Sequence, residues 1–177
     1  MPLPRVLLDI ARNPWLSVGG AVVLGAAVAK VSNNQRAHEY YASLAKPTGN
    51  PPTWALGPIW GTLYGMLGYA AHILARLADT SSFQEIAGRA LRLHYVQLAL
   101  NLVYMPIFFQ IQSRGFALVD ILAVTGLTWK LVNEARTLPG PTFVLLIPYA
   151  FWMLYSTYLN VGLIYLNSKV RRHSWSS

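Results

Sequence analysis

The sequence predicts an all-α protein, an integral membrane bundle of five transmembrane helices. Of the 177 residues, 54% are hydrophobic and only 11% are charged, and the mean hydropathy is +0.37. Soluble domains carry about 25% charged residues, so this chain has too few polar groups to cover a water-exposed surface. The apolar residues also gather into long segments bounded by Lys and Arg. This composition excludes ordinary soluble enzymes, disordered chains and nucleic-acid modules.

The net charge of +8 does not indicate a nucleic-acid partner, because the 14 Lys and Arg residues are dispersed between apolar blocks. Such charges are typical of loops at anionic lipid headgroups, so the expected surrounding is the lipid bilayer. They divide equally between the two sides of a five-span bundle, which leaves the orientation undetermined. The chain has no cysteine, and no disulfide or metal site is expected.

One domain over residues 1–177 accommodates all five expected spans, each near the length of about 20 residues that a bilayer core requires. Breakers separate them: Pro51-Pro52 opens the second span, Gly115 precedes the fourth, and Pro139-Gly140-Pro141 precedes the fifth. The spans are expected at about 13–31, 52–76, 92–112, 116–136 and 141–168.

The connection at residues 30–50 is the longest polar segment of the chain. Connections of that length in a compact bundle are often lids over a binding site. We expect it to close over a pocket mouth, with Tyr40, Tyr41 and Leu44 facing a ligand and Arg36 and Glu39 in solvent. The alternative is a plain solvated connector.

The second span carries an aromatic face, because Trp60 and Tyr64 are four residues apart and Leu56 lies one turn earlier. Pro58 loosens the helix near Trp60. A separate stripe of small residues is expected to serve helix packing, rather than contact with a partner protein: Gly57, Gly61 and Gly65.

The third span carries a polar face of His94, Gln97, Asn101 and Tyr104. Polar side chains at membrane depth face the bundle interior, where they join helices or line a cavity, and we favour the joining role for Gln97 and Asn101. His94 is expected near the interface, hydrated, and not as a haem ligand, because no second ligand stands at a suitable spacing.

Two further features complete the candidate residues. Asp120 is interpreted as an acid near a helix start, favoured there by the helix dipole, in preference to a proton relay. The fifth span carries a stripe of Tyr149, Trp152, Ser156 and Asn160. Trp152 and Trp60 lie too deep for the interfacial belt, which favours a role as pocket walls.

Four motifs, in this order along the chain, resemble the signature of the translocator protein/tryptophan-rich sensory protein family (TspO/MBR, peripheral-type benzodiazepine receptor). The longest runs from Lys46-Pro47 through Pro51-Pro52-Thr53-Trp54-Ala55-Leu56-Gly57-Pro58-Ile59-Trp60-Gly61-Thr62-Leu63-Tyr64. The others are Leu98-Ala99-Leu100-Asn101 with Pro106-Ile107-Phe108-Phe109, Gly115-Phe116-Ala117-Leu118-Val119-Asp120, and Pro148-Tyr149-Ala150-Phe151-Trp152 with Leu159-Asn160. The similarity covers about residues 30–167, most of the chain.

The resemblance implies a five-helix bundle, a homodimer, that binds porphyrins or haem, sterols and benzodiazepine-type ligands between its helices. Carried over by position, the expected ligand-binding residues are Leu56, Pro58, Trp60, Tyr64, Asn101, Phe116, Tyr149, Trp152 and Ser156. Phe116 replaces a Trp of animal members, and Val161 replaces the Tyr of their sterol motif. The remaining match to a sterol motif is Leu163, Tyr165 and Lys169, a pattern that many helix ends fit by chance.

Three functions follow as alternatives. The first is a membrane receptor or carrier for porphyrin or haem, which is a ligand and not a required cofactor, with Arg36, His38 and Lys46 near its propionates. The second is light-dependent porphyrin degradation, with Trp60 and Trp152 as the catalytic residues; no acid–base pair or nucleophile suits a conventional enzyme. The third is a regulatory membrane partner without turnover. In a eukaryote we expect a multi-pass protein of the mitochondrial outer membrane or another intracellular membrane.

Overall fold

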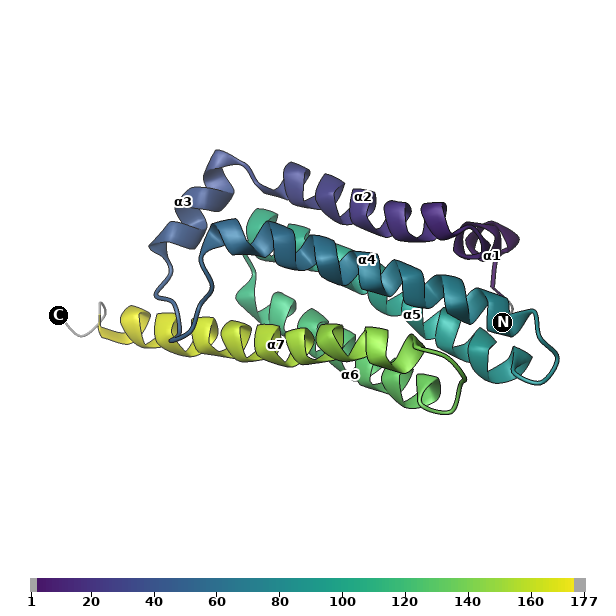
Figure 1. The fold of residues 1–177 in the computed structure, drawn as a ribbon. Coiled ribbons are helices and arrows are strands. Elements are labelled where there is room, and N and C mark those ends of the chain that lie inside the picture. The colour runs from purple at the N-terminus through teal and green to yellow at the C-terminus, as the bar shows by residue number, and fades with distance from the viewer. Residues whose placement is uncertain (1–2, 174–177) are drawn as a thin grey trace.

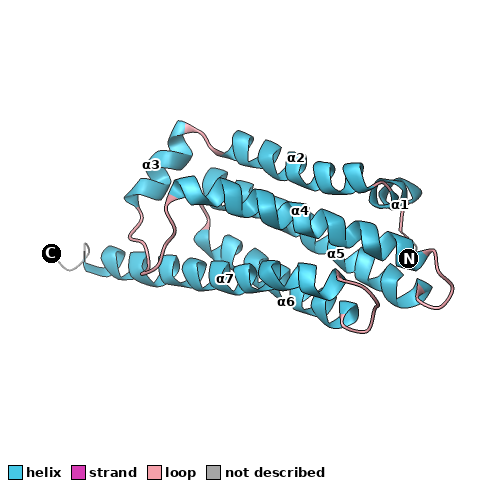
Figure 2. Ribbon diagram, viewed as in Figure 1, coloured by secondary structure: helices cyan, strands magenta, loops and turns pink. Residues whose placement is uncertain are grey.

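The protein is a bundle of long helices lying side by side, with its connections at the two ends (Figures 1 and 2). The structure, a computed structural model, describes residues 3–173, and the side chains through residue 168. Every regular element within 3–173 is helical, which confirms the all-α prediction. The elements are α1 (Arg5–Arg12), α2 (Pro14–Ser32), α3 (Gln35–Ser43), α4 (Thr53–Ala78), α5 (Gln84–Met105), the π-helix η1 (Pro106–Gln110), α6 (Arg114–Ala135) and α7 (Thr142–His173).

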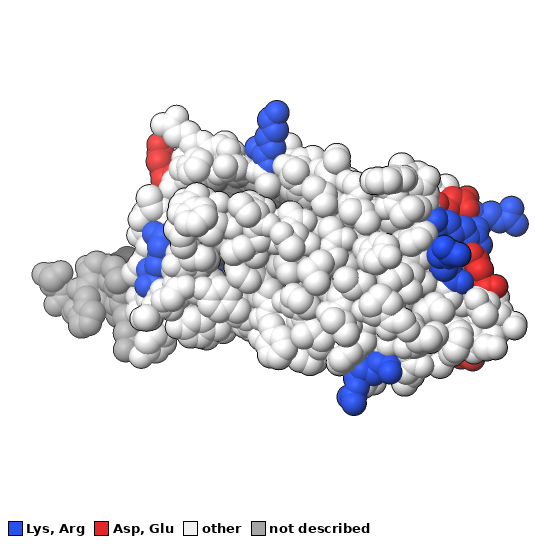
Figure 3. Space-filling model, in the orientation of Figure 1, with Lys and Arg blue, Asp and Glu red and all other residues white. Residues whose placement is uncertain are grey.

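Three of the described helices are long and apolar enough to cross a bilayer: α2, α6, and α7 over Thr142–Ser168, with mean hydropathies of 1.6, 1.6 and 1.4. Charged side chains gather mainly near the two ends of the bundle, and the broad surface between them is almost free of charge on the face shown in Figure 3. This distribution is that of a membrane protein, as predicted from the composition.

The five long helices occupy the expected segments, but α5 begins at Gln84, well before the expected 92. Its first turns lie at a charged end of the bundle. There Arg89 pairs with Glu85 at 2.6 Å and with Glu134 of α6 at 3.4 Å. These pairs support a helix whose first turns are too polar to be recognised as part of a span.

The short helix α1 was not predicted, and it packs against α2 and α4, with one hydrogen bond from the middle of α5. The Tyr95 hydroxyl donates to the Leu7 carbonyl at 2.7 Å, and Arg12 pairs with Asp79 at 2.7 Å. The hydrogen bond from Arg12 lowers the pKa of the Asp79 carboxyl. Tertiary contacts therefore hold this helix, which is too short to be stable alone.

The connection at 30–50 also differs from the sequence expectation, because it contains the helix α3. The Asn34 side chain caps this helix by accepting from the Ala37 backbone N–H at 2.9 Å. The Asn34 amide also donates to Gln110 of η1 at 3.2 Å. The segment is thus a structured element between α2 and α4.

Close helix packing depends on Gly68 and Gly25, and not on the glycine stripe predicted for this role. The Ser17 hydroxyl donates to the Gly68 carbonyl at 2.7 Å, and a Cβ at Gly68 would lie 2.4 Å from the Ser17 carbonyl oxygen. A Cβ at Gly25 would overlap the ring of Tyr64. Within the described chain nothing lies within 4 Å of a Cβ at the three stripe positions, so the predicted packing role is wrong there: Gly57, Gly61 and Gly65.

Candidate functional site

Six aromatic side chains form a continuous row between α4 and α7, which we call the aromatic cluster: Trp60, Tyr64, Tyr149, Trp152, Tyr155 and Tyr158. Its centre is the edge-to-face contact of Trp60 with Trp152, with ring centroids 6.2 Å apart and planes at 86°. Trp60 also contacts Tyr64 at 5.4 Å, and Trp152 contacts Tyr155 at 5.3 Å. The structure therefore brings together the two tryptophans predicted to form pocket walls.

Hydrogen bonds to α5 hold two tyrosines of the aromatic cluster, Tyr64 and Tyr149. The Tyr64 hydroxyl donates to Asn101 Oδ1 at 2.5 Å, and the Tyr149 hydroxyl donates to Gln97 Oε1 at 2.8 Å. These bonds join α4 and α7 to α5, which confirms the helix-joining role of Gln97 and Asn101. The Trp152 Nε1 is buried and has no hydrogen-bond partner in the described structure, so it is a donor that a ligand can use.

Residues 45–50, which we call the lid segment, lie against α7 beside one end of the aromatic cluster. The Tyr155 hydroxyl donates to the Gly49 carbonyl, and the Tyr158 hydroxyl donates to the Thr48 carbonyl at 3.0 Å. Farther along α7, Asn167 bonds to the backbone of Ala45, accepting at 3.0 Å and donating at 2.9 Å. The lid segment is thus fixed to the helix that carries Trp152.

Tyr40, Tyr41 and Leu44 lie elsewhere than expected, because they pack against η1. Tyr40 and Tyr41 contact the ring of Phe108 at 5.8 and 6.5 Å, and Leu44 belongs to the same apolar group. Partial burial raises the pKa of Tyr40. These residues anchor α3 to the bundle, whereas Arg36, His38 and Glu39 are exposed as expected for a solvated face.

The remaining expected ligand-binding residues divide into two groups. Leu56 and Ser156 are half-buried on the two helices that carry the tryptophans, and Pro58 is exposed on α4. Phe116 does not join the aromatic cluster: it is 70% exposed and lies on a different surface, between α5 and α6. Phe116 stands in the first turn of α6, on the side of that helix that lines this exposed surface with Ile107 and Ile111.

His94 and the sterol motif also depart from expectation. His94 is only 2% exposed, so the predicted hydrated position is wrong, and its Nδ1 has no hydrogen-bond partner among the described residues. Leu163 is buried in the apolar group around Phe108, whereas Tyr165 is 57% exposed. These two residues therefore do not form one surface, and the side chain of Lys169 lies outside the described residues.

No group of three or more His, Asp or Glu side chains is placed to hold a metal ion within the described part of the chain. The candidate site is an aromatic site with a few polar atoms, which suits a flat apolar ligand.

Sequence reasoning missed Tyr155 and Tyr158, although a signal was present. Both continue the stripe of Tyr149 and Trp152 at three-residue intervals, which places them along one side of α7. Their hydroxyls hold the lid segment, a role that depends on the path of the connection and is invisible in the spacing alone.

The chain is similar to known proteins over most of its length. The TspO/MBR family profile matches residues 17–166. The translocator protein of Bos taurus is 33% identical over 162 residues, which cover 90% of this chain and 94% of that protein. The translocator protein of Homo sapiens is 37% identical, with coverages of 83% and 88%. The tryptophan-rich sensory protein of Cereibacter sphaeroides is 32% identical, with coverages of 73% and 77%. The chain belongs to the TspO/MBR family.

Proposed function

We propose that this protein is a membrane receptor or carrier that binds porphyrin or haem in the aromatic cluster. The observation that carries the proposal is the edge-to-face pair of Trp60 and Trp152, centroids 6.2 Å apart, beside the unpartnered Trp152 Nε1. A macrocycle offers two flat faces on which the indole rings can pack. Its apolar surface is removed from lipid or water when it binds. Because the two rings touch, entry of the macrocycle separates them.

The lid segment is proposed to control release of the ligand. It is bonded to Tyr155 and Tyr158, the last rings of the aromatic cluster. The exposed Arg36 and His38 of α3 precede it and are proposed to meet the propionates of a porphyrin. Lys46 contributes to the segment itself, since its ammonium donates to the Leu44 carbonyl at 3.2 Å.

Five membrane spans are proposed for the five long helices. α4 and α5 run beside the three apolar helices and contact them. Their mean hydropathy is reduced by Gly, Trp and Tyr on α4, and by buried Gln97 and Asn101 on α5, which face the interior and not lipid. We therefore propose one multi-pass domain over 1–177. In a eukaryote, its proposed location is the mitochondrial outer membrane or another intracellular membrane.

Sterols and benzodiazepine-type compounds are proposed as further ligands of the aromatic cluster, because both present rigid apolar rings to such walls. Leu163 is buried and Tyr165 is exposed, so the two do not form one binding surface at the end of α7. This favours the aromatic cluster as the proposed sterol site. A homodimer is also proposed, as the resemblance to the TspO/MBR family implies.

Binding of protoporphyrin IX to the full chain in lipid nanodiscs tests the central proposal, with the shift of the porphyrin absorbance band as the signal. The Trp60→Phe/Trp152→Phe double variant is expected to bind about tenfold or more weakly, because each indole contact contributes about 1 kcal/mol beyond area burial. Trp129→Phe is the matched control, since Trp129 pairs with Phe151 outside the aromatic cluster. Unchanged affinity in the double variant, or an equal loss in the control, overturns the proposal.

Light-dependent porphyrin degradation is the second candidate, favoured by the direct contact of the two indoles, which gives electrons a short path between the rings. Illumination of the complex should then yield a product spectrum that the double tryptophan variant does not give. If the bound porphyrin only bleaches, at the rate of free porphyrin, the protein binds porphyrin but does not degrade it.

A further inference from the structure

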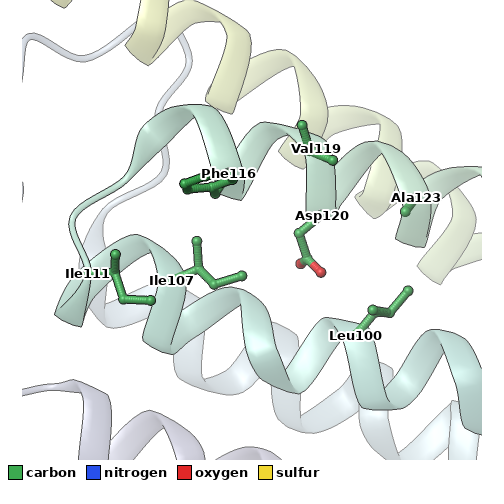
Figure 4. Close-up of a pocket in the computed structure, with 7 residues that line it drawn as sticks. All are labelled: Leu100, Ile107, Ile111, Phe116, Val119, Asp120 and Ala123. Carbon is green, nitrogen blue, oxygen red and sulfur yellow. The ribbon is translucent and has the colours of Figure 1, made fainter.

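A groove on the outer side of the bundle, between α6 and the end of α5, forms a second candidate site. We call it the outer groove; it has a volume of about 390 Å³. Ile107 and Ile111 line one wall, and Phe116, Val119 and Ala123 of α6 line the other (Figure 4). It shares no lining residue with the aromatic cluster. Its volume lies within the range of about 300–1,000 Å³ that small-molecule sites occupy.

The groove lies where α5 changes into the π-helix η1 at Pro106. Proline lacks the backbone N–H that would continue the α-helical ladder, and a π turn is wider than an α turn. Ile107 belongs to this wide turn, and Ile111 follows its end. The local backbone change thus shapes the wall opposite α6.

One polar side chain, Asp120, points into this apolar groove (Figure 4). Asp120 is 8% exposed, and its Oδ2 is buried without a hydrogen-bond partner in the described structure. The lining contains no basic residue to pair with it. A charged carboxylate in apolar surroundings is costly unless it takes up a proton or a donor or cation compensates it, so a donor or cation from outside the chain would stabilise its charged form.

We propose that the outer groove binds a lipophilic amine, whose protonated amino group pairs with Asp120 while its apolar tail lies along the groove. A cation compensates both the charge and the hydrogen-bonding capacity of the carboxylate, whereas a hydroxyl compensates only the second. The side walls open outward, since Ile111, Phe116 and Val119 are 66%, 70% and 66% exposed. A ligand therefore enters sideways from the lipid, independently of porphyrin binding.

The test uses three photoreactive probes with one C16 diazirine chain and a primary amine, a hydroxyl or a carboxylate as head group. Each is irradiated with the full chain in phosphatidylcholine nanodiscs, and the labelled residues are mapped by mass spectrometry. The amine probe is expected to label the groove residues about tenfold or more above the alcohol, as a charge-assisted hydrogen bond implies. Equal labelling by all three probes overturns the proposal.

Two variants and one control locate the effect. Asp120→Asn keeps the shape and removes the charge, so labelling by the amine is expected to fall to that of the alcohol. Ala123→Trp fills the exposed groove and is expected to reduce labelling by the amine even if the Asn variant fails to fold. Leu122→Trp adds the same bulk on the exposed surface outside the lining and is expected to leave labelling unchanged.

Two outcomes with the variants also overturn the proposal. Labelling by the amine that persists in Asp120→Asn shows that the carboxylate is not the partner. Labelling that persists in Ala123→Trp shows that the groove is not the site. None of these outcomes bears on the separate proposal that the aromatic cluster binds porphyrin.

Discussion

Replacement of Gly68 by alanine tests the packing of α2 on α4, the contact that positions the helix carrying Trp60. The added Cβ would lie 2.4 Å from the Ser17 carbonyl oxygen and 2.7 Å from Val18 Cα. Both are backbone atoms, so no side-chain rotation relieves the overlap. The two helices must move apart, and the bond from the Ser17 hydroxyl to the Gly68 carbonyl, 2.7 Å long, is weakened or lost.

The expected cost combines three contributions. Overpacking of a close contact costs about 1–3 kcal/mol. Loss of one buried hydrogen bond costs about 1 kcal/mol more. Alanine gains about 1 kcal/mol of helix propensity over glycine. The net free energy of unfolding is therefore expected to fall by about 1–3 kcal/mol.

The assay is thermal unfolding of the purified full chain in detergent, followed by circular dichroism. At about 2–4 °C per kcal/mol for a protein of this size, Gly68→Ala is expected to lower the Tm by roughly 2–12 °C. Gly65→Ala is the matched control on the same helix, because a Cβ there meets nothing within 4 Å. The control is expected to keep or slightly raise the Tm.

The refuting results are specific. A Gly68→Ala variant as stable as the unmodified chain would show that α2 and α4 do not approach this closely at Ser17. An equal fall in the Tm of Gly65→Ala would show that the glycine stripe is packed, within the chain or against a second copy. It would contradict the conclusion that Gly68 lies in a close contact while Gly65 does not.

Three further predictions follow from the same contacts. Tyr64→Phe leaves the buried amide oxygen of Asn101 without its donor and is expected to lower the free energy of unfolding by about 1–3 kcal/mol, measured in the same detergent assay; an unchanged Tm would contradict this bond. Arg12 lowers the pKa of Asp79 in the folded state, so as the pH falls the unfolded state takes up the proton first. The stabilisation by this ion pair is therefore present at neutral pH and is lost in acid below about pH 4. Asp79→Asn removes the ion pair and should reduce the difference in Tm between pH 7 and pH 3. Tyr155→Phe removes one of the bonds that hold the lid segment to α7 and is expected to speed dissociation of bound protoporphyrin severalfold in stopped flow, whereas an unchanged off-rate would contradict a lid.

Length, apolar content and bounding charges made most of the long helices predictable, but they did not place the start of α5, whose first turns are polar. The short helices α1 and α3 were not predictable, since neither has the length or apolar content of a span. α1 depends on a bond from Tyr95 and on the Arg12–Asp79 pair, and α3 depends on Phe108. Such tertiary contacts join residues far apart in the sequence and leave no local pattern.

The faces of the helices were harder to predict than their bounds. The spacing of the glycines on α4 showed a stripe, but the rotation of α4 turns that stripe away from α2 and places Gly68 in the contact. Rotation of α6 likewise turns Phe116 outward. Trp60 and Trp152 were identified because both stand too deep for an interfacial belt, and the contact of α4 with α7 brings them together.

The most direct test of the central claim is a structure of the full chain with protoporphyrin IX bound in lipid nanodiscs. We predict that the macrocycle lies between α4 and α7, with the rings of Trp60 and Trp152 parted from their 6.2 Å contact and packed against it. The lid segment should cover one edge of the macrocycle. A macrocycle held elsewhere, for example in the outer groove, with the two indoles still in contact, would contradict the account.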